Sequence, residues 1–244
     1  MSPVQPKTLP DGRRSGRIWV ILLLLAGILG LAVGIFGIST REPSQEFKDV
    51  NGVGDMQRIF GGVRQFEDRL GVADAPVQVQ YFVDVQSSTY ADQFLETIPP
   101  IVTTQVRNGD VQLLLRNRSL TVNATERSFY GIQAAAEQGY GWQYAYLMVR
   151  NQEAAKEARL DDEFLETIAG GIRYLDIFQW KEDFDEGVKP DSEMTRGLED
   201  DDKQAIDLKI TDAPAFLVSG PAGTEMLMEA PDLQALEQAI DKVR

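Results

Sequence analysis

Four consecutive residues with hydroxyl side chains lie in the part of this chain that is most favourable for chemistry. They are Ser87, Ser88, Thr89 and Tyr90. They lie between a segment of alternating apolar residues, 77–83, and a segment whose apolar residues recur at helical spacing from residue 91 onward. A strand that leads directly into a helix places reactive groups beside free backbone amides and the positive end of the helix dipole. The turn at 87–90 is therefore the first candidate site.

The composition restricts what this turn is able to catalyse. The 244 residues include 0 Cys and 0 His, so a thiol nucleophile, a disulfide, a Ser-His-Asp triad and a zinc-thiolate site are excluded within them. Ionising a serine hydroxyl near neutral pH needs a pKa shift of roughly six units, about 8 kcal/mol. A helix dipole supplies about 0.3–2 kcal/mol. We therefore predict that the turn is not enzymatic and that its hydroxyl groups cap the following helix.

The segment that leads into the turn resembles a known family. Ala75-Pro76-Val77 and Tyr81-Phe82-Val83-Asp84 are similar to the first strand of DsbA-like proteins of the thioredoxin superfamily, whose motif reads roughly APV…FxDxxCPxC. The CxxC positions of that motif correspond to residues 87–90, so the frame is present and both thiols are missing. The resemblance implies an α/β, thioredoxin-like fold that has lost thiol-disulfide exchange.

A second segment, near the C-terminus, resembles the same family. Residues 210–220, ITDAPAFLVSG, are similar to the family motif V-x-G-T-P-T-F-x-V-x-G, with Ala213 where Thr or Val is usual. The family's proline has a cis peptide bond that faces the active-site turn, so we predict that the Ala213–Pro214 bond is cis. The resemblance also implies a groove that accepts an extended peptide as an added strand. Its predicted partner-binding residues are Ser87, Tyr90, Ala213 and Pro214.

The middle of the chain is predicted to insert helices into this fold. The helix after the turn contains Pro99 and Pro100, which are expected to kink or split it, and a second strand is predicted at 111–116. The insertion is predicted to run from about residue 123 to 208, as the resemblance implies. A hairpin across 220–223 and a helix from Pro231 complete a domain predicted at 71–244. Within the insertion, an aromatic series fits a groove lining or a partly buried helix: Tyr140, Trp142, Tyr144 and Tyr146.

The N-terminal part of the chain is predicted to anchor it in a membrane. Residues 18–38 carry no charge and are long enough to span a bilayer as a helix. Basic residues precede this segment, so the positive-inside rule places residues 1–17 in the cytoplasm and the C-terminal domain outside it. A cleaved signal peptide is the alternative. Residues 39–70 are predicted to be a tether with a juxtamembrane amphipathic helix. The apolar face of that helix would include Met56, Ile59, Phe60, Val63, Phe66 and Leu70.

The charge of the chain indicates which partners it would bind. The formal net charge is -14, which argues against nucleic acid or anionic lipid as a ligand and favours solubility or a basic partner. The acidic run from Glu199 to Asp202 is expected to be a solvated turn or helix start rather than a metal site. No cofactor is predicted.

These features predict a single-pass membrane protein whose exported, redox-inactive domain binds other proteins. It would act as a structural accessory subunit of a membrane complex or as a holder of exported clients. The alternative is an enzyme that resembles the kappa-class glutathione transferases, which are also DsbA-like. Asp84-Val85-Gln86-Ser87 is similar to their D-x-x-S segment, in which the serine hydroxyl donates a hydrogen bond to a bound thiolate.

Overall fold

The computed structural model describes residues 50–244 except 86, 88–90, 119–124, 153–160 and 212. The chain divides into two compact units, Met1–Ser44 and Gln45–Arg244, and the fold below is that of the second unit. The predicted cytoplasmic segment 1–17, the predicted span 18–38 and the first part of the tether, 39–49, lie outside the described residues. Among the residues that are described, none belongs to a helix of the length and apolarity that a bilayer crossing requires.

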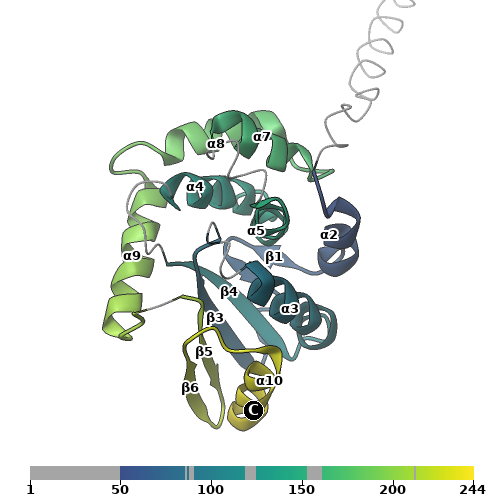
Figure 1. Ribbon diagram of the computed structural model, residues 1–244, viewed down its shortest axis with the longest axis vertical. Coiled ribbons are helices and arrows are strands. Elements are labelled where there is room, and N and C mark those ends of the chain that lie inside the picture. Colours follow the sequence, from purple (N-terminus) through teal and green to yellow (C-terminus); the bar gives the residue numbers. More distant parts are fainter. Residues whose placement is uncertain (1–49, 86, 88–90, 119–124, 153–160, 212) are drawn as a thin grey trace, which may run out of the picture. The chain divides into compact units, whose positions relative to one another are not determined.

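A mixed six-stranded sheet forms the centre of this unit, with the strand order β1-β2-β4-β3-β5-β6 (Figure 1). The central strand β3 runs parallel to β4 and antiparallel to β5, so the segment before the turn is hydrogen-bonded on both sides. Two hairpins extend the sheet, β1–β2 beside β4 and β5–β6 beside β3. The bounds are β1 Gln65–Phe66, β2 Arg69–Leu70, β3 Val77–Val83, β4 Val111–Asn117, β5 Ala215–Gly220 and β6 Gly223–Leu227.

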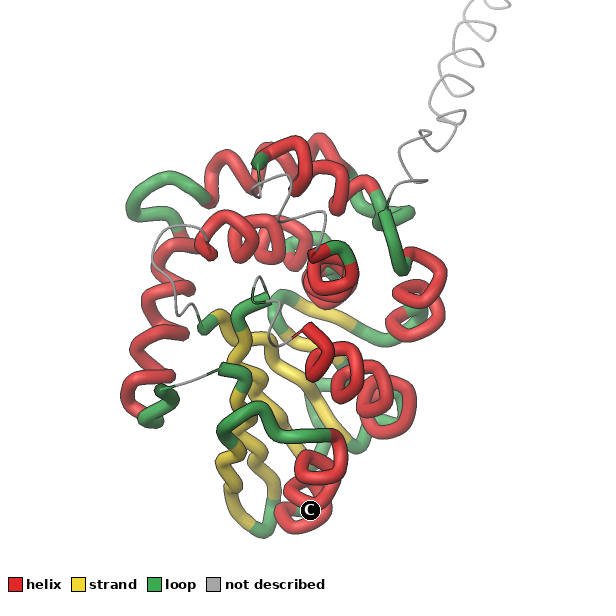
Figure 2. The backbone as a smooth tube through the Cα atoms, in the orientation of Figure 1, coloured by secondary structure: helices red, strands yellow, loops and turns green. Residues whose placement is uncertain are grey.

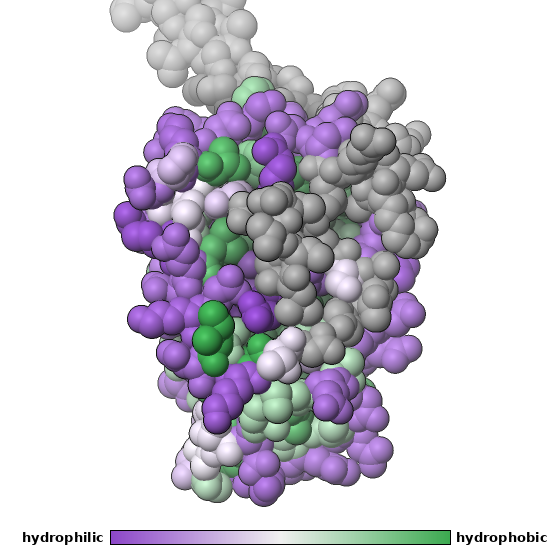
Figure 3. Space-filling view, turned by 60° about the vertical axis from the view of Figure 1, so that its left-hand side comes forward, coloured by the Kyte–Doolittle hydropathy of each residue, from purple (hydrophilic) through white to green (hydrophobic). Residues whose placement is uncertain are grey.

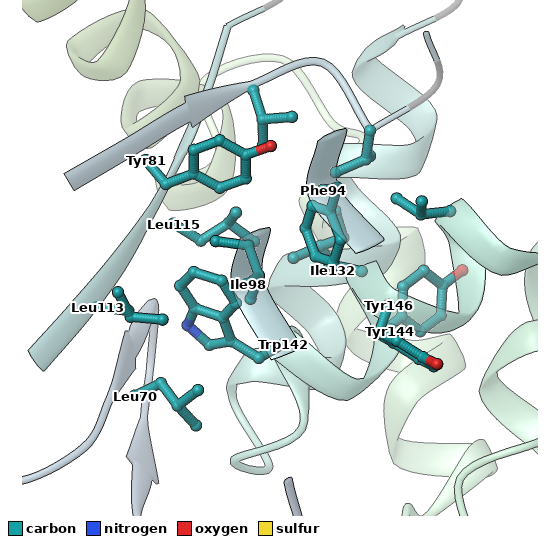
Figure 4. Close-up of a cluster of buried hydrophobic side chains, with 14 of the residues drawn as sticks. Leu70, Tyr81, Phe94, Ile98, Leu113, Leu115, Ile132, Trp142, Tyr144 and Tyr146 are labelled. Carbon is teal, nitrogen blue, oxygen red and sulfur yellow. The ribbon is translucent and has the colours of Figure 1, made fainter. Parts of the chain in front are cut away.

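The main hydrophobic core lies between the sheet and the helices on one of its faces. Alternate β3 residues, Val77, Val79 and Tyr81, are fully buried, as the period of two predicts. Helices α3 (Ala91–Ile101) and α10 (Leu233–Val243) pack on this face. The Tyr81 ring stacks on Phe216 of β5 with 4.5 Å between ring centroids. Figure 4 shows how side chains of the sheet, of α3 and of the inserted helices meet in this core.

The two consecutive prolines change the helix without ending it. Pro99 and Pro100 lie inside α3, and the chain continues directly as a π-helix, η2 (Val102–Val106). Each proline lacks the N–H that would close an α-helical turn. In the π-helix that follows, the Thr104 hydroxyl donates a hydrogen bond to the carbonyl of Pro100 at 2.8 Å. The predicted kink or break therefore takes the form of a wider helical turn.

Five described helices form the insertion between β4 and β5, and in Figure 2 most of this insertion lies above the end of the sheet, while its last helix runs down beside the sheet. They are α4 Thr125–Ala136, α5 Gly141–Arg150, α7 Asp162–Gly170, α8 Ile177–Gly187 and α9 Glu193–Asp207. Helix α5 is buried along nearly its whole length, so Trp142, Tyr144 and Tyr146 pack in the core, whereas the half-buried Tyr140 before the helix lines a groove. Trp142 donates from Nε1 to the Asp68 carbonyl at 2.9 Å, and Tyr144 donates to the Leu165 carbonyl at 3.0 Å.

The amphipathic helix predicted within the tether is correct in its first part and wrong beyond Phe60. Helix α2 covers Val53–Phe60 and ends at Gly61, whose N–H donates to the Gln57 carbonyl. Gly62 follows with a φ of 76°, a backbone conformation that favours glycine and does not continue a helix. Residues 65–70 form the β1–β2 hairpin instead, and Leu70 pairs with Leu113 of β4. The folded domain therefore begins well before the predicted boundary at residue 71.

A pair of asparagines fixes the N-terminal end of the described chain to the insertion. The N–H of Asn51 donates to Oδ1 of Asn151 at 2.9 Å, and Nδ2 of Asn151 donates to the Asn51 carbonyl at 3.0 Å. The neighbouring side chain of Val50 is buried beside Gly171, where a Cβ would lie 3.1 Å from Val50 Cγ1. We refer to the reciprocal contact between Asn51 and Asn151 as the asparagine clamp.

Candidate functional site

The structure describes one of the four hydroxyl residues in the predicted turn. Ser87 is half-buried, and its N–H donates to the Asp84 carbonyl at 3.1 Å, which closes the turn after β3. Ser88, Thr89 and Tyr90 lie outside the described residues, and the described part of the chain continues with α3 at Ala91. The expected order of strand, turn and helix is therefore present around Ser87.

The Ala213–Pro214 peptide bond is cis, which confirms the prediction made from the sequence. Both residues are buried. Because Ala215 pairs with Phe82 across the β3–β5 ladder, Pro214 lies beside the end of β3 from which the turn starts. The sheet thus brings together two predicted site segments that are more than a hundred residues apart in the sequence. The Pro214 carbonyl already accepts a hydrogen bond from the Ala230 N–H at 3.3 Å.

A chain of hydrogen bonds between neutral groups supports the first turn of α3. Tyr81 donates its hydroxyl to Oε1 of Gln93 at 2.8 Å, and Nε2 of Gln93 donates to the Pro231 carbonyl at 2.8 Å. Burial raises the pKa of the Tyr81 hydroxyl well above its ordinary value, so it stays protonated and remains a donor. Sequence analysis did not single out Gln93, because nothing in its local pattern shows that two distant elements converge on it.

A second buried amide reaches the turn from the insertion. Gln152, just after α5, donates from Nε2 to the Val85 carbonyl, and its Oε1 has no hydrogen-bond partner. Both Val85 and Gln152 are buried. The position of the turn therefore depends on the helical insertion as well as on the sheet. No sequence signal indicated this contact.

A large cleft opens between the β1–β2 turn, the end of β4 and the helices α4, α8 and α9. Its volume is about 770 Å³. Its described lining includes two arginines, Arg69 and Arg116, and seven acidic residues. The acidic residues are Glu67, Asp68, Glu137, Asp183, Glu186, Glu193 and Asp201. We call this the acidic cleft.

An ion-pair network forms the floor of the acidic cleft. Arg116 donates to the Asp68 carboxylate and lies 3.5 Å from Oδ1 of Asp201, which is itself only 8% exposed. Burial raises the pKa of Asp201 to about 7, although Arg116 and a hydrogen bond from the Asn117 N–H oppose the shift. The expectation that the run from Glu199 to Asp202 is a solvated turn or helix start is wrong, because the run lies inside α9 and Asp201 is buried, although Glu199 and Asp200 are exposed as expected. The burial of Asp201 comes from contact with β4, which the local sequence does not encode.

The wall of the cleft carries carboxylates that repel one another. Burial raises the pKa of Glu137, and the negative charges of Asp183, Glu67 and Glu193 raise it further. Among the residues that the structure describes, no group of three or more acidic side chains has the geometry of a metal site. The cleft is therefore a broad region of negative potential rather than a compact set of ligands.

Comparison with known proteins identifies the fold. No family model and no curated protein matches this sequence. Among solved structures, oxidised BdbD from Bacillus subtilis superposes with a TM-score of 0.61 at 16% identity, over 74% of this chain and 96% of BdbD. This is a DsbA-like thioredoxin fold. DsbA from Chlamydia trachomatis gives a TM-score of 0.60 at 15% identity, over 72% of this chain and 91% of that protein.

A third structure of the same type agrees with these two. The alpha-DsbA1 protein of Wolbachia pipientis superposes with a TM-score of 0.57 at 15% identity, over 72% of this chain and 89% of its own. At such identities the likeness establishes the fold alone. The DsbA-like architecture with its helical insertion matches the fold class that the sequence predicts.

Proposed function

We propose that this chain is a membrane-tethered, extracytoplasmic protein whose DsbA-like domain binds a protein partner and performs no thiol chemistry. The sequence supports the absence of thiol chemistry, because 244 residues without cysteine hold no thiolate to attack a disulfide. Ser87 takes the place of the attacking thiol, and no histidine is present to activate its hydroxyl. The domain keeps the frame of the fold and uses it for binding, as an accessory subunit of a membrane complex.

The acidic cleft is the observation that carries this proposal. It gathers seven carboxylates in one concave surface, and the pKa of Glu137 is raised partly by its acidic neighbours. A lysine or arginine side chain placed among these groups would relieve their repulsion, and its attraction would be strengthened by the partial burial of the site. The partner is therefore a protein that presents a basic segment.

The accessory-subunit role is favoured over the holding of exported clients. A client holder needs a broad apolar surface. The large apolar side chains that are exposed in the described part of the chain are distributed over separate elements: Phe66, Tyr174, Phe178, Ile206 and Met228. On the side of the molecule seen in Figure 3, hydrophilic side chains predominate, although hydrophobic side chains gather in the lower part of the view.

The predicted groove between the Ser87 turn and Pro214 remains a second, untested surface. Ser87 and Pro214 lie near one another, but the Ser87 N–H and the Pro214 carbonyl are engaged within the chain. We do not propose the transferase alternative, because no observation at Ser87 favours a bound thiolate.

The test is to isolate the full chain from its native membranes in mild detergent and to identify stoichiometric companions by mass spectrometry. A cleft variant combines Glu137→Gln, Asp183→Asn and Glu193→Gln. A control variant removes the same number of exposed charges elsewhere, with Glu163→Gln, Glu199→Gln and Glu237→Gln. We expect the cleft variant to lose its companion and the control variant to retain it. Isolation of the unaltered chain without a companion would contradict the subunit role, and an unchanged companion in the cleft variant would contradict the role of the cleft.

A further inference from the structure

A second concave surface differs from the acidic cleft in both charge and polarity. It is a groove of about 550 Å³ between α2, the turn that precedes α5 and the loop that follows α7. Its floor includes the buried side chains of Met56, Phe60 and Ile172. Among the described residues that line it, Arg173 alone is charged, and its charge is positive. In a chain of net charge -14, a cavity lined without acidic side chains is distinctive.

The rim of this groove carries an exposed aromatic residue beside a cation. Tyr174 is 73% exposed, and the guanidinium carbon of Arg173 lies 5.2 Å from the centre of its ring. Tyr140, half-buried, lines the same groove. Tyrosine and arginine each combine an apolar body with a polar end, which suits the boundary between water and lipid. An arginine also pairs readily with a phosphate group.

The position of the groove is tied to the point where the chain joins the domain. Ile172 and Arg173 directly follow Gly171, which packs against Val50. The asparagine clamp holds the next residue, Asn51, in place. Residues 39–49 separate Val50 from the apolar segment 18–38, and eleven residues reach at most about 40 Å when extended. The groove is therefore confined to the neighbourhood of any bilayer that holds residues 18–38.

We propose that the rim formed by Tyr140, Arg173 and Tyr174 rests on the headgroup region of the bilayer that anchors the chain. This inference depends on the membrane tether of the proposed function. Arg173 would pair with lipid phosphate, while the tyrosine rings lie among the headgroups. Because the described lining contains no acidic residue, this face lacks the repulsion that an anionic bilayer would exert on the acidic remainder of the domain.

The test uses single-cysteine variants of the full chain, which has no cysteine of its own. Gln57→Cys places a fluorophore on an exposed position of α2 at the groove. Gln238→Cys places the same fluorophore on the exposed face of α10, which lies at the lower end of the domain in Figure 1, away from α2. Each labelled chain is reconstituted into vesicles of phosphatidylcholine and phosphatidylglycerol that contain a headgroup-region quencher lipid.

We expect the label at position 57 to lose most of its emission and the label at position 238 to keep it. Adding Arg173→Gln and Tyr174→Ser to the Gln57→Cys chain should restore the emission, and both replacements are at exposed positions. Equal emission from positions 57 and 238, in a chain that alkaline carbonate does not extract, would overturn the inference and leave the tether intact. Unchanged quenching in the Arg173→Gln/Tyr174→Ser chain would overturn the role given to these residues. Extraction by carbonate would overturn the tether itself and the inference with it.

Discussion

The backbone N–H of Asn117 donates to Oδ2 of Asp201 at 2.9 Å, although the two residues are 84 positions apart in the sequence. This bond connects the last residue of β4 to the middle of α9. It closes the insertion onto the sheet at the floor of the acidic cleft.

Protonation of Asp201 is expected to stabilise the domain. Burial raises its pKa to about 7 from the ordinary 3.8, so between these values the folded state holds a proton that the unfolded chain releases. The stabilisation is complete below the unfolded pKa and is lost as the pH rises through the folded one. The free energy of unfolding should therefore fall with rising pH in this window, by up to about 1.4 kcal/mol per pH unit from this group.

Asp201→Asn isolates this contribution, because asparagine imitates the protonated acid and still offers an oxygen to Asn117. In urea unfolding of residues 45–244, the variant should lose part of the pH dependence and should exceed the unaltered domain in stability above neutral pH. Asp200→Asn, at an exposed neighbouring position, serves as the control. Parallel pH profiles for the unaltered and Asp201→Asn domains would contradict the assignment.

Replacement of two helical glycines by alanine is expected to change the stability of the domain in opposite directions. A Cβ on Gly131 of α4 would lie 2.6 Å from the hydroxyl oxygen of Tyr144, a fully buried residue. Gly131→Ala should therefore destabilise the domain by about 1–3 kcal/mol, in spite of the better helix propensity of alanine. A Cβ on Gly197 of α9 would meet nothing within 4 Å. Gly197→Ala should stabilise the domain by about 0.5–1 kcal/mol. Thermal unfolding of the two variants measures both effects, and equal shifts would show that packing against Tyr144 does not limit position 131.

Replacement of Gln152 should loosen the turn without unfolding the domain. Gln152→Met removes the hydrogen bond to the Val85 carbonyl, but it also removes an Oε1 that is buried without a partner. These two effects oppose each other, so we expect the global free energy of unfolding to change by less than about 1 kcal/mol. Hydrogen exchange at the Ser87 amide should become faster, because the neighbouring carbonyl is no longer held. Unaltered exchange at Ser87 would show that the sheet alone fixes the turn.

The unaltered chain should not accelerate the reduction of insulin by dithiothreitol. It contains no thiol, and a hydroxyl at position 87 does not attack a disulfide. Ser87→Cys combined with Tyr90→Cys restores the CxxC spacing of the DsbA-like motif, and a thiolate at a helix N-terminus has a lowered pKa. We expect this double variant to accelerate insulin reduction and the unaltered chain not to. Activity in the unaltered chain would contradict the proposed loss of thiol chemistry.

Strands β3 to β6 could be predicted from the sequence because their signals are local, whereas β1 and β2 could not. The alternation in Val77, Val79 and Tyr81 identifies β3, and the segment around Pro214 identifies the strand that pairs with it. The boundary at Phe60 was missed because the apolar spacing that continues to Leu70 also fits a short hairpin. Two glycines at 61 and 62 decide between the alternatives, and the second has a positive φ.

The acidic cleft could not be predicted from the sequence. Its side chains come from the β1–β2 turn, β4, α4, α8 and α9, and their convergence depends on tertiary packing. Asp201 is one of four consecutive acidic residues, and nothing in that run distinguishes it from its exposed neighbour Asp200. Asp201 differs from Asp200 because it accepts a hydrogen bond from the N–H of Asn117, which belongs to a distant strand.

The asparagine clamp has a mechanical consequence. A pull on the chain before Val50 reaches the paired hydrogen bonds between Asn51 and Asn151 before it reaches any strand. Asn151 directly follows α5, whose side chains are packed among the other helices and the core, so the load passes into the body of the domain. Because Gln152, the next residue, donates to the Val85 carbonyl, such a load would also reach the turn at Ser87.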